Sequence, residues 1–404
     1  MSYLGLGVVP PEPSLGLMLS QNVTFTGGTI SLYSDLSRID QFGFGKNTWY
    51  TQPITVTYKQ PLFAYNQFKW DKKIAPKEYE RSKRLYLESM EEVNVKAITA
   101  FFTLLKAKVA YDVSVESYEN ARMMHDIALN RMQLGTVSKD ECIQLEIRML
   151  TDSIAINENT VRMREAQMSL CSILGVEDNL EFCPVFDFEA IPDIQISYDD
   201  MLALTRENSS FDINNEINVL NAESAIAKAK AARGMSMQLN ARFGLSNSNS
   251  QFREAYKNLI DQEVVGLTFS IPIFDWGLGK GRVKKAQAAA DVVRAQVEQS
   301  ENDFKRNLFS AVGQFNNQRG QCVVSKKASD LATMRNTLMM DKFASGKIGT
   351  MELNQAQQES DSSKQKYIED VSNFWLYYYT LRKLSLYDFI NKQNIEVSFD
   401  EMVE

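Results

Sequence analysis

The sequence predicts a mainly α-helical chain with a small β part, built from two long helical hairpins that arose by tandem duplication. A glycine-centred motif occurs twice, a strand-like motif occurs twice at the same offset, and most of the chain carries a helical apolar pattern. The glycine motif lies in residues 130–148 and again in residues 341–359. Its glycines, Gly135 and Gly346, are 211 positions apart, so the whole chain can be compared with itself at that shift.

The strand-like motif repeats at the same offset. Residues 54–68 align with residues 265–279 without a gap. Two matches at one offset are explained better by duplication than by chance. The shift of 211 positions superimposes Pro61 on Pro272, Phe63 on Phe274, Tyr65 on Trp276, Val137 on Ile348, Glu141 on Glu352 and Gln144 on Gln355.

The duplication divides the chain into five predicted segments. These are an irregular N-terminal lead-in (1–20), a first repeat (21–175), a linker (176–210), a second repeat (211–391) and a C-terminal tail (392–404). Each repeat is expected to hold a β-hairpin and a long helical hairpin, with the tips at Gly135 and Gly346. The second repeat begins with an alanine-rich incoming helix, whereas the equivalent place at the chain start carries three prolines and no signal-peptide pattern. We therefore expect that the chain start is truncated or misassigned.

Long helices account for most of the chain. Residues 67–134 contain one proline near the start and no glycine, and their apolar residues recur at helical spacing. At about 1.5 Å per residue, this helix would extend for roughly 100 Å. Ser138 is expected to cap the start of the returning helix in the first hairpin, and Thr350 that in the second. Gly175 is expected to end the first of these returning helices. Further helices are predicted for residues 138–174, 211–233, 283–345 and 350–391.

Four strands are predicted from apolar and polar residues that alternate. The alternation is regular in residues 235–246 and 263–274, and weaker in residues 23–36 and 48–58. In the last of these, we place Tyr50, Ile54, Val56 and Tyr58 on one face. One apolar face suits a soluble sandwich or the wall of a transmembrane barrel, and the alternation alone does not separate these two.

Composition excludes several classes of function. The chain has 404 residues and a formal net charge of −7, which disfavours binding to nucleic acid because that affinity comes largely from Lys and Arg. The four cysteines have no zinc-site spacing, and no run of eighteen apolar residues indicates a transmembrane helix. The single histidine, His125, has no nucleophile near it in sequence, and no phosphate-binding glycine loop is present. We predict no enzyme and no cofactor.

The tips LGTVSKDECIQLE and SGKIGTMELNQAQ, with the corners QPLFAYNQ and IPIFDWGLGKGRVKKAQA, resemble those of the bacterial outer-membrane efflux proteins, the TolC-type channel family. The resemblance implies a homotrimer in which each chain gives four strands to a shared 12-stranded outer-membrane β-barrel and its long helices to a periplasmic α-barrel. It implies a passive exit duct for efflux or type I secretion. The implied partners are a periplasmic adaptor protein, an inner-membrane RND or ABC pump reached through it, and outer-membrane lipid.

The resemblance also assigns residue roles in this sequence. Adaptor docking at the tips falls on Gly135, Thr136, Val137, Gly346, Lys347 and Ile348. A periplasmic gate with an inward-facing acidic ring falls on Glu141, Glu352 and Gln355. The third of these is neutral, so the resemblance implies a single carboxylate ring in place of a double one. The strand-to-helix corners are formed by Pro61, Phe63, Pro272, Phe274, Trp276 and Gly277.

A soluble coiled-coil scaffold or adaptor protein, dimerising through the long hairpins, is the alternative that the sequence leaves open. A scaffold needs a continuous apolar seam between charged flanks and stays soluble. A channel helix keeps one face polar toward a water-filled lumen, and its sheet requires detergent. The transported cargo cannot be deduced from the sequence.

Overall fold

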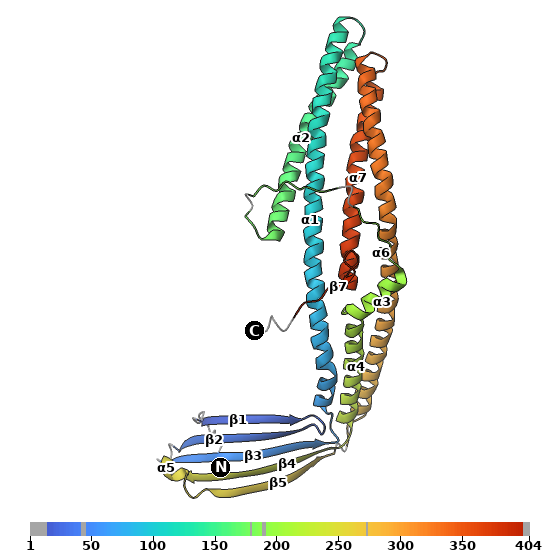
Figure 1. Ribbon diagram of the computed structural model, residues 1–404. Helices are drawn as coiled ribbons and strands as arrows, with labels where there is room; N and C mark the ends of the chain where they lie inside the picture. Colours follow the sequence, from blue (N-terminus) through green and yellow to red (C-terminus); the bar gives the residue numbers. More distant parts are fainter. Residues whose placement is uncertain (1–13, 42–45, 178–179, 188–190, 272–273, 399–404) are drawn as a thin grey trace. The chain divides into compact units, whose positions relative to one another are not determined.

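A computed structural model describes residues 14–41, 46–177, 180–187, 191–271 and 274–398 (Figure 1). The chain forms two compact units, each made of two segments of the sequence. Unit 1 contains residues 1–81 and 212–300, and unit 2 contains residues 82–211 and 301–404. The sheet lies in unit 1, and the tips of both helical hairpins lie in unit 2.

The four longest helices repeat at the sequence offset. α1 spans Gln67–Gln133 and α6 spans Leu278–Ala344, each 67 residues long. α2 spans Lys139–Leu174 and α7 spans Thr350–Ser385, each 36 residues long. The first and last residues of α6 and α7 lie 211 positions after those of α1 and α2. The two halves of the chain therefore share one local structure. Leu386, in the left-handed region, follows the end of α7 at the place where Gly175 follows the end of α2. The last residue of α7 is Ser385, six residues earlier than the sequence predicts.

Shorter elements connect the long helices. α3 (Tyr198–Asn208) lies within the stretch predicted as linker, and α4 (Phe211–Arg233) is the predicted incoming helix. α5 (Phe252–Ala255) is a single turn, and β6 (Tyr387–Asp388) pairs with β7 (Gln393–Asn394). Among the described residues, no helix has the length and apolar character needed to cross a membrane.

In the described part of unit 1, the sheet has five antiparallel strands in sequence order, where the sequence predicts four (Figure 1). The additional strand, β1 (Ser14–Val23), occupies part of the segment predicted to be irregular. It extends an alternating pattern, SLGLMLSQNV, across a turn at Gly27, whose φ of 78° suits glycine. The other strands are β2 (Gly28–Gln41), β3 (Lys46–Leu62), β4 (Ser236–Asn249) and β5 (Ile260–Ser270).

Strand register gives this sheet one apolar and one polar face. Residues that pair directly across antiparallel strands lie on the same face. The apolar face carries Leu15, Leu17, Leu19, Ile30, Leu32, Ile54, Val56, Phe243, Val265, Leu267 and Phe269, all of them exposed. The opposite face carries Ser20, Ser31, Lys59, Thr57, Gln238, Asn240, Arg242 and Thr268. An exposed apolar face that crosses five strands is far larger than the patch that a soluble monomer tolerates.

One face assignment made from the sequence is wrong. Tyr50 pairs with Ser37 and lies on the polar face, whereas Tyr58 pairs with Ile30 and lies on the apolar face. The register shifts by one residue between Thr51 and Ile54. This β-bulge inserts one extra residue into β3 and therefore inverts the alternation on one side of it.

The main core of unit 2 joins α1, α3, α6 and α7. It is formed by the buried residues Phe102, Leu105, Ile196, Met201, Leu308, Val312, Phe315, Cys322, Val371, Phe374, Tyr378 and Leu381. The aromatic run 374–384 therefore supplies packing surface, as the sequence predicts. The ring centroids of Phe315 and Phe374 are 5.2 Å apart.

A buried carboxylate fixes the chain after α7. Asp388 accepts hydrogen bonds from the Tyr378 hydroxyl at 2.7 Å, from the Ile390 and Asn391 amides at 3.0 Å, and from the Asn391 side chain at 2.9 Å. Burial acts to raise the pKa of Asp388, but the hydrogen bonds from Asn391, Tyr378 and Ile390 outweigh it and hold the pKa below its usual value.

We expect Asp388→Asn to destabilise unit 2 by about 1–3 kcal/mol at pH 7, because hydrogen bonds to a charged acceptor are lost. Since the folded-state pKa is lowered, the stabilisation is present above the unfolded pKa and is lost as pH falls through the folded pKa. Guanidinium unfolding followed by tryptophan fluorescence checks this. The difference between wild type and variant should be largest at pH 7 and should shrink at pH 3. A constant difference at both values would contradict the role of the charge.

Candidate functional site: the two hairpin tips

The two hairpin tips share one turn geometry. Gly135 and Gly346 have φ of 77° and 73°, in the left-handed region that glycine adopts without strain. The Gly135 amide donates to the Met132 carbonyl at 2.9 Å, and the Gly346 amide donates to the Phe343 carbonyl at 2.9 Å. The amide of the following residue donates a second hydrogen bond at each tip, from Thr136 to the Arg131 carbonyl and from Lys347 to the Lys342 carbonyl. These paired bonds end each helix in a Schellman-type turn.

Glu141 and Glu352, the predicted gate carboxylates, both cap returning helices. Ser138 accepts from the Glu141 amide at 3.2 Å, and Glu141 accepts from the Ser138 amide at 3.1 Å, which completes a capping box. At the second tip, the N-cap is Gly349 and not Thr350, because the helix begins one residue earlier than the hydroxyl suggests. Glu352 accepts from the Gly349 amide at 3.2 Å, so only half of the box is present.

We expect Ser138→Ala to destabilise the start of α2 by about 1 kcal/mol, because the capping hydroxyl is removed. Hydrogen exchange of the amides in residues 139–142 should accelerate about fivefold, while α7 stays unchanged. Gly349→Ser is the matched change at the other tip. It supplies the missing hydroxyl and should stabilise the start of α7 by about a few tenths of a kcal/mol, which should slow hydrogen exchange there. Unchanged exchange in both variants would contradict the capping account.

Two polar contacts hold the tips of the hairpins together. Arg131 of α1 donates to the Phe343 carbonyl at 2.7 Å, and its guanidinium lies 5.6 Å from the Phe343 ring centroid. Thr350 of α7 donates to Gln144 of α2 at 2.9 Å. A buried apolar cluster lies beside them, formed by Met124, Ala128, Val137, Cys142, Leu145, Phe343 and Leu353. Arg131 is not among the site residues predicted from the sequence. The one local signal for it is its position four residues before Gly135, where a basic residue favours a helix end.

The residues assigned to adaptor docking differ in exposure. Gly135, Thr136, Gly346 and Lys347 are exposed at the surface of the tips. Val137 is only 9% exposed and belongs to the buried cluster, and Ile348 is half-buried against it. Gln355, assigned to the gate, is exposed on α7. A docking partner can therefore reach the two glycines and their polar neighbours more easily than the aliphatic residues that follow.

The strand-to-helix corners carry exposed aromatic side chains. Phe63, Phe274 and Trp276 are 69%, 73% and 87% exposed, and the last two rings pack edge to face at 4.7 Å. Pro61 is the penultimate residue of β3, and Pro272 lies outside the described residues. Gly277 has a φ of 82° and so permits the turn into α6.

Asp275 caps the start of α6 and was not singled out from the sequence. Its carboxylate accepts from the Gly279 amide at 2.8 Å and from the Gly277 amide at 3.0 Å. These backbone hydrogen bonds lower the pKa of Asp275 from its usual value. An aspartate just before a helix of small residues is the signal that predicts this cap.

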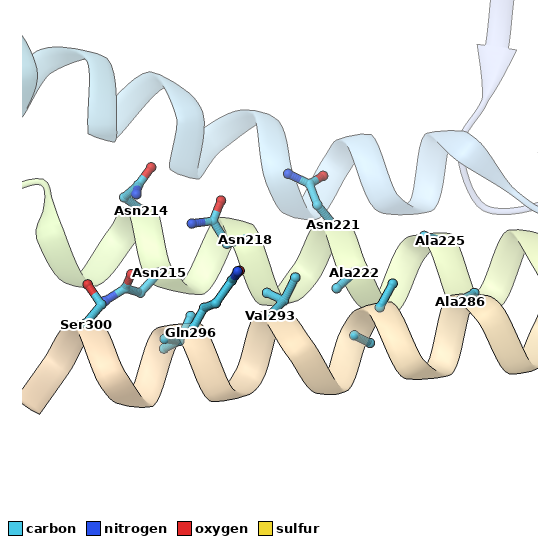
Figure 2. A pocket seen from close by; sticks show the side chains of 13 residues that line it. Asn214, Asn215, Asn218, Asn221, Ala222, Ala225, Ala286, Val293, Gln296 and Ser300 are labelled. Atoms are coloured by element: carbon cyan, nitrogen blue, oxygen red, sulfur yellow. The ribbon is translucent and has the colours of Figure 1, made fainter.

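A groove of about 580 Å³ lies between α4 and the start of α6 in unit 1. Figure 2 shows Asn214, Asn218 and Asn221 along one side of α4, and Asn215 and Gln296 between the two helices. The remaining lining is mostly alanine, with no titratable side chain. The described residues also hold no group of three or more His, Cys, Asp or Glu arranged to bind a metal. The groove therefore offers amide contacts rather than acid, base or nucleophilic chemistry.

Comparisons with known proteins agree with this geometry. Residues 214–384 match the family model described as outer membrane efflux protein. The outer-membrane channel OprN has a TM-score of 0.68 and 13% identity, over 92% of this chain and 81% of that one. The CmeC outer membrane channel of Campylobacter jejuni has a TM-score of 0.65 and 13% identity, over 97% and 80%.

The open-state MtrE outer membrane channel of Neisseria gonorrhoeae has a TM-score of 0.62 and 13% identity, over 95% of this chain and 82% of that one. No curated protein sequence matches the chain significantly. The structural matches establish the fold of long helical hairpins with a small antiparallel sheet, and the family match covers most of the second repeat. Residues 214–384 therefore resemble the outer membrane efflux protein family that the sequence analysis names, and the solved channel structures share the fold of this chain.

Proposed function

We propose that three copies of this chain assemble into a passive exit duct of a tripartite efflux or type I secretion system. In this proposal, the sheets form a shared barrel wall in the outer membrane and the long helices form an α-barrel in the periplasm. The observation that carries the proposal is the exposed apolar face of the sheet, opposite a polar face. Lipid can cover the first face, and a water-filled lumen can hydrate the second.

The number of strands in the barrel stays a prediction. Twelve strands follow from four strands in each copy, but the residues that the structure describes form a sheet of five strands. The soluble scaffold is disfavoured, because it leaves the apolar face of the sheet without a cover.

We propose that a periplasmic adaptor docks at the exposed tip residues Gly135, Thr136, Gly346 and Lys347. The shared turn geometry of the two tips presents nearly the same backbone surface twice in each chain. Three copies would thus offer six similar sites to the adaptor, which connects the duct to an inner-membrane RND or ABC pump. Energy comes from that pump, so this chain needs no catalytic residues.

We propose that Glu352 forms the acidic ring of the periplasmic gate, with Gln355 neutral beside it. Glu352→Gln tests this, because glutamine at the same position keeps the hydrogen bond to Gly349 and removes only the charge. In planar bilayers, the wild-type protein should conduct with cation selectivity, and the variant should lose most of that selectivity. Glu141→Gln tests the other predicted gate carboxylate, at the first tip, by the same measurement.

The bilayer experiment has two results that count against the proposal. Equal selectivity in the wild type and in Glu352→Gln would remove Glu352 from the gate. A purified protein that inserts into the bilayer and never conducts would contradict the exit duct itself.

A further inference from the structure

Basic side chains gather where the end of α4 meets the start of α6 in unit 1, although the whole chain has a formal net charge of −7. Figure 1 shows these two helix ends beside the end of the sheet at which β4 begins and β5 stops. A pocket of about 620 Å³ lies between the helices. Four exposed cations line it: Lys230 and Arg233 from α4, and Lys280 and Lys284 from α6. We call it the corner pocket.

Most of this positive charge is not balanced within the chain. Asp275 acts on the charge of Arg233, but its carboxylate already accepts from the Gly277 and Gly279 amides as the cap of α6. Among the residues that the structure describes, the three lysines of the corner pocket make no salt bridge, and its remaining lining is uncharged. Grouped cations of this kind attract an anion from solution or from a membrane surface.

The repeat shows that the corner pocket occurs only once in the chain. Lys280 and Lys284 have basic counterparts 211 positions earlier, Lys69 and Lys73, which are exposed at the start of α1. The two cations of α4 have no such counterparts, because positions 19 and 22 hold leucine and asparagine in β1. Lysines on one helix make a charged surface, whereas cations on two facing helices can hold a single anion from both sides.

Exposed aromatic rings adjoin the corner pocket and favour a lipid over a free anion. Phe274 and Trp276 lie in the segment between β5 and α6, and both rings are mostly exposed. Aromatic side chains in such places lie at the level where the hydrocarbon of a membrane meets its headgroups. An inorganic anion would use the cations alone. A phospholipid would use both features, since its phosphate can reach the cations while its glycerol and acyl chains contact the rings.

We propose that the corner pocket binds the phosphate headgroup of an anionic phospholipid, such as phosphatidylglycerol. This inference rests on the proposed membrane position of the sheet, because that position places the end of β5 at the level of the headgroups. Lys230, Lys280 and Lys284 hold the phosphate through charge-assisted hydrogen bonds, as basic pockets near a membrane surface do. The bound lipid then fixes the depth at which the sheet lies in the membrane.

Lipid titration of the full chain in detergent tests the corner pocket. The protein is labelled at the exposed thiol of Cys183, and binding is followed by microscale thermophoresis. Dioctanoyl phosphatidylglycerol should bind about tenfold more tightly than the zwitterionic dioctanoyl phosphatidylcholine, and added salt should reduce the difference. Lys280→Gln combined with Lys284→Gln should weaken the binding of phosphatidylglycerol about tenfold.

Lys69→Gln combined with Lys73→Gln is the matched control. It removes the same two charges from the equivalent positions of the first repeat, where no cations face them from a second helix. The affinity for phosphatidylglycerol should change less than about twofold. Equal losses in the two double variants would show a diffuse attraction to basic helix starts and would overturn the corner pocket.

Inorganic phosphate and Trp276→Ala separate a lipid from a free anion. Phosphate should compete only weakly with phosphatidylglycerol, and Trp276→Ala should weaken the binding of the lipid but not that of phosphate. Phosphate that binds as tightly as the lipid would assign the pocket to a free anion and overturn the lipid site.

Light scattering of the same preparation keeps this inference distinct from the proposed function. A detergent-purified trimer that does not distinguish the two lipids would overturn the corner pocket and leave the exit duct standing. A protein that is stable without detergent as a monomer would remove the membrane position of the sheet, and with it both proposals.

Discussion

Leu267→Arg should prevent stable insertion of the sheet into a membrane, whereas Thr268→Arg, one residue further along β5, should be tolerated. Leu267 pairs with Leu239 on the apolar face, and Thr268 pairs with Gln238 on the polar face. An arginine that faces lipid near the bilayer midplane costs about 2–4 kcal/mol, while one that faces a watery lumen costs little. The pair of variants differs in the face of the sheet and in almost nothing else.

Membrane flotation of the protein expressed in cells measures this difference. Leu267→Arg should leave the membrane fraction, and Thr268→Arg should remain in it. A soluble sheet predicts another result, because Leu267 is 49% exposed and arginine there would cost almost nothing. Equal behaviour of the two variants would therefore contradict a lipid-facing wall.

Phe374→Ala should be the most destabilising single change in unit 2, with a loss of about 3–5 kcal/mol. The side chain is fully buried on α7, in contact with Phe315, so truncation leaves a large cavity that the surrounding helices cannot fill. Guanidinium unfolding in detergent, followed by circular dichroism, should show a clear shift of the midpoint to lower denaturant.

Phe309→Ala is the matched control for this change. Phe309 lies on α6 and is 66% exposed, with one edge-to-face contact to Tyr198. Its removal should cost no more than about 1.5 kcal/mol. A loss of similar size in both variants would mean that the buried core does not dominate the stability of unit 2.

The helical part of this fold was accessible from the sequence because its signals are local and repeated. The glycines at positions 135, 175 and 346 mark three helix ends, and the structure places all three in the left-handed region. The repeat of 211 positions also predicted which helices are equivalent in the two halves. The structure agrees, since α1 and α6 have equal lengths and equivalent ends. In a helix of 67 residues, the apolar periodicity also remains recognisable when single residues depart from it.

The sheet and the tip contacts were less accessible, because they depend on single residues and on non-local pairing. One inserted residue in β3 moves Tyr50 to the other face, and alternation alone does not reveal the bulge. β1 was missed because three prolines precede it. The contact from Arg131 to Phe343 joins residues 212 positions apart, which no local pattern connects.

The central claim is that three copies of this chain form one membrane-embedded duct. Light scattering of the full chain, extracted from cell envelopes in detergent and corrected for bound detergent, tests it most directly. We expect a protein mass of three times the 45.9 kDa chain in each micelle. A stable monomer or dimer that remains in solution without detergent would contradict the duct and favour a soluble scaffold.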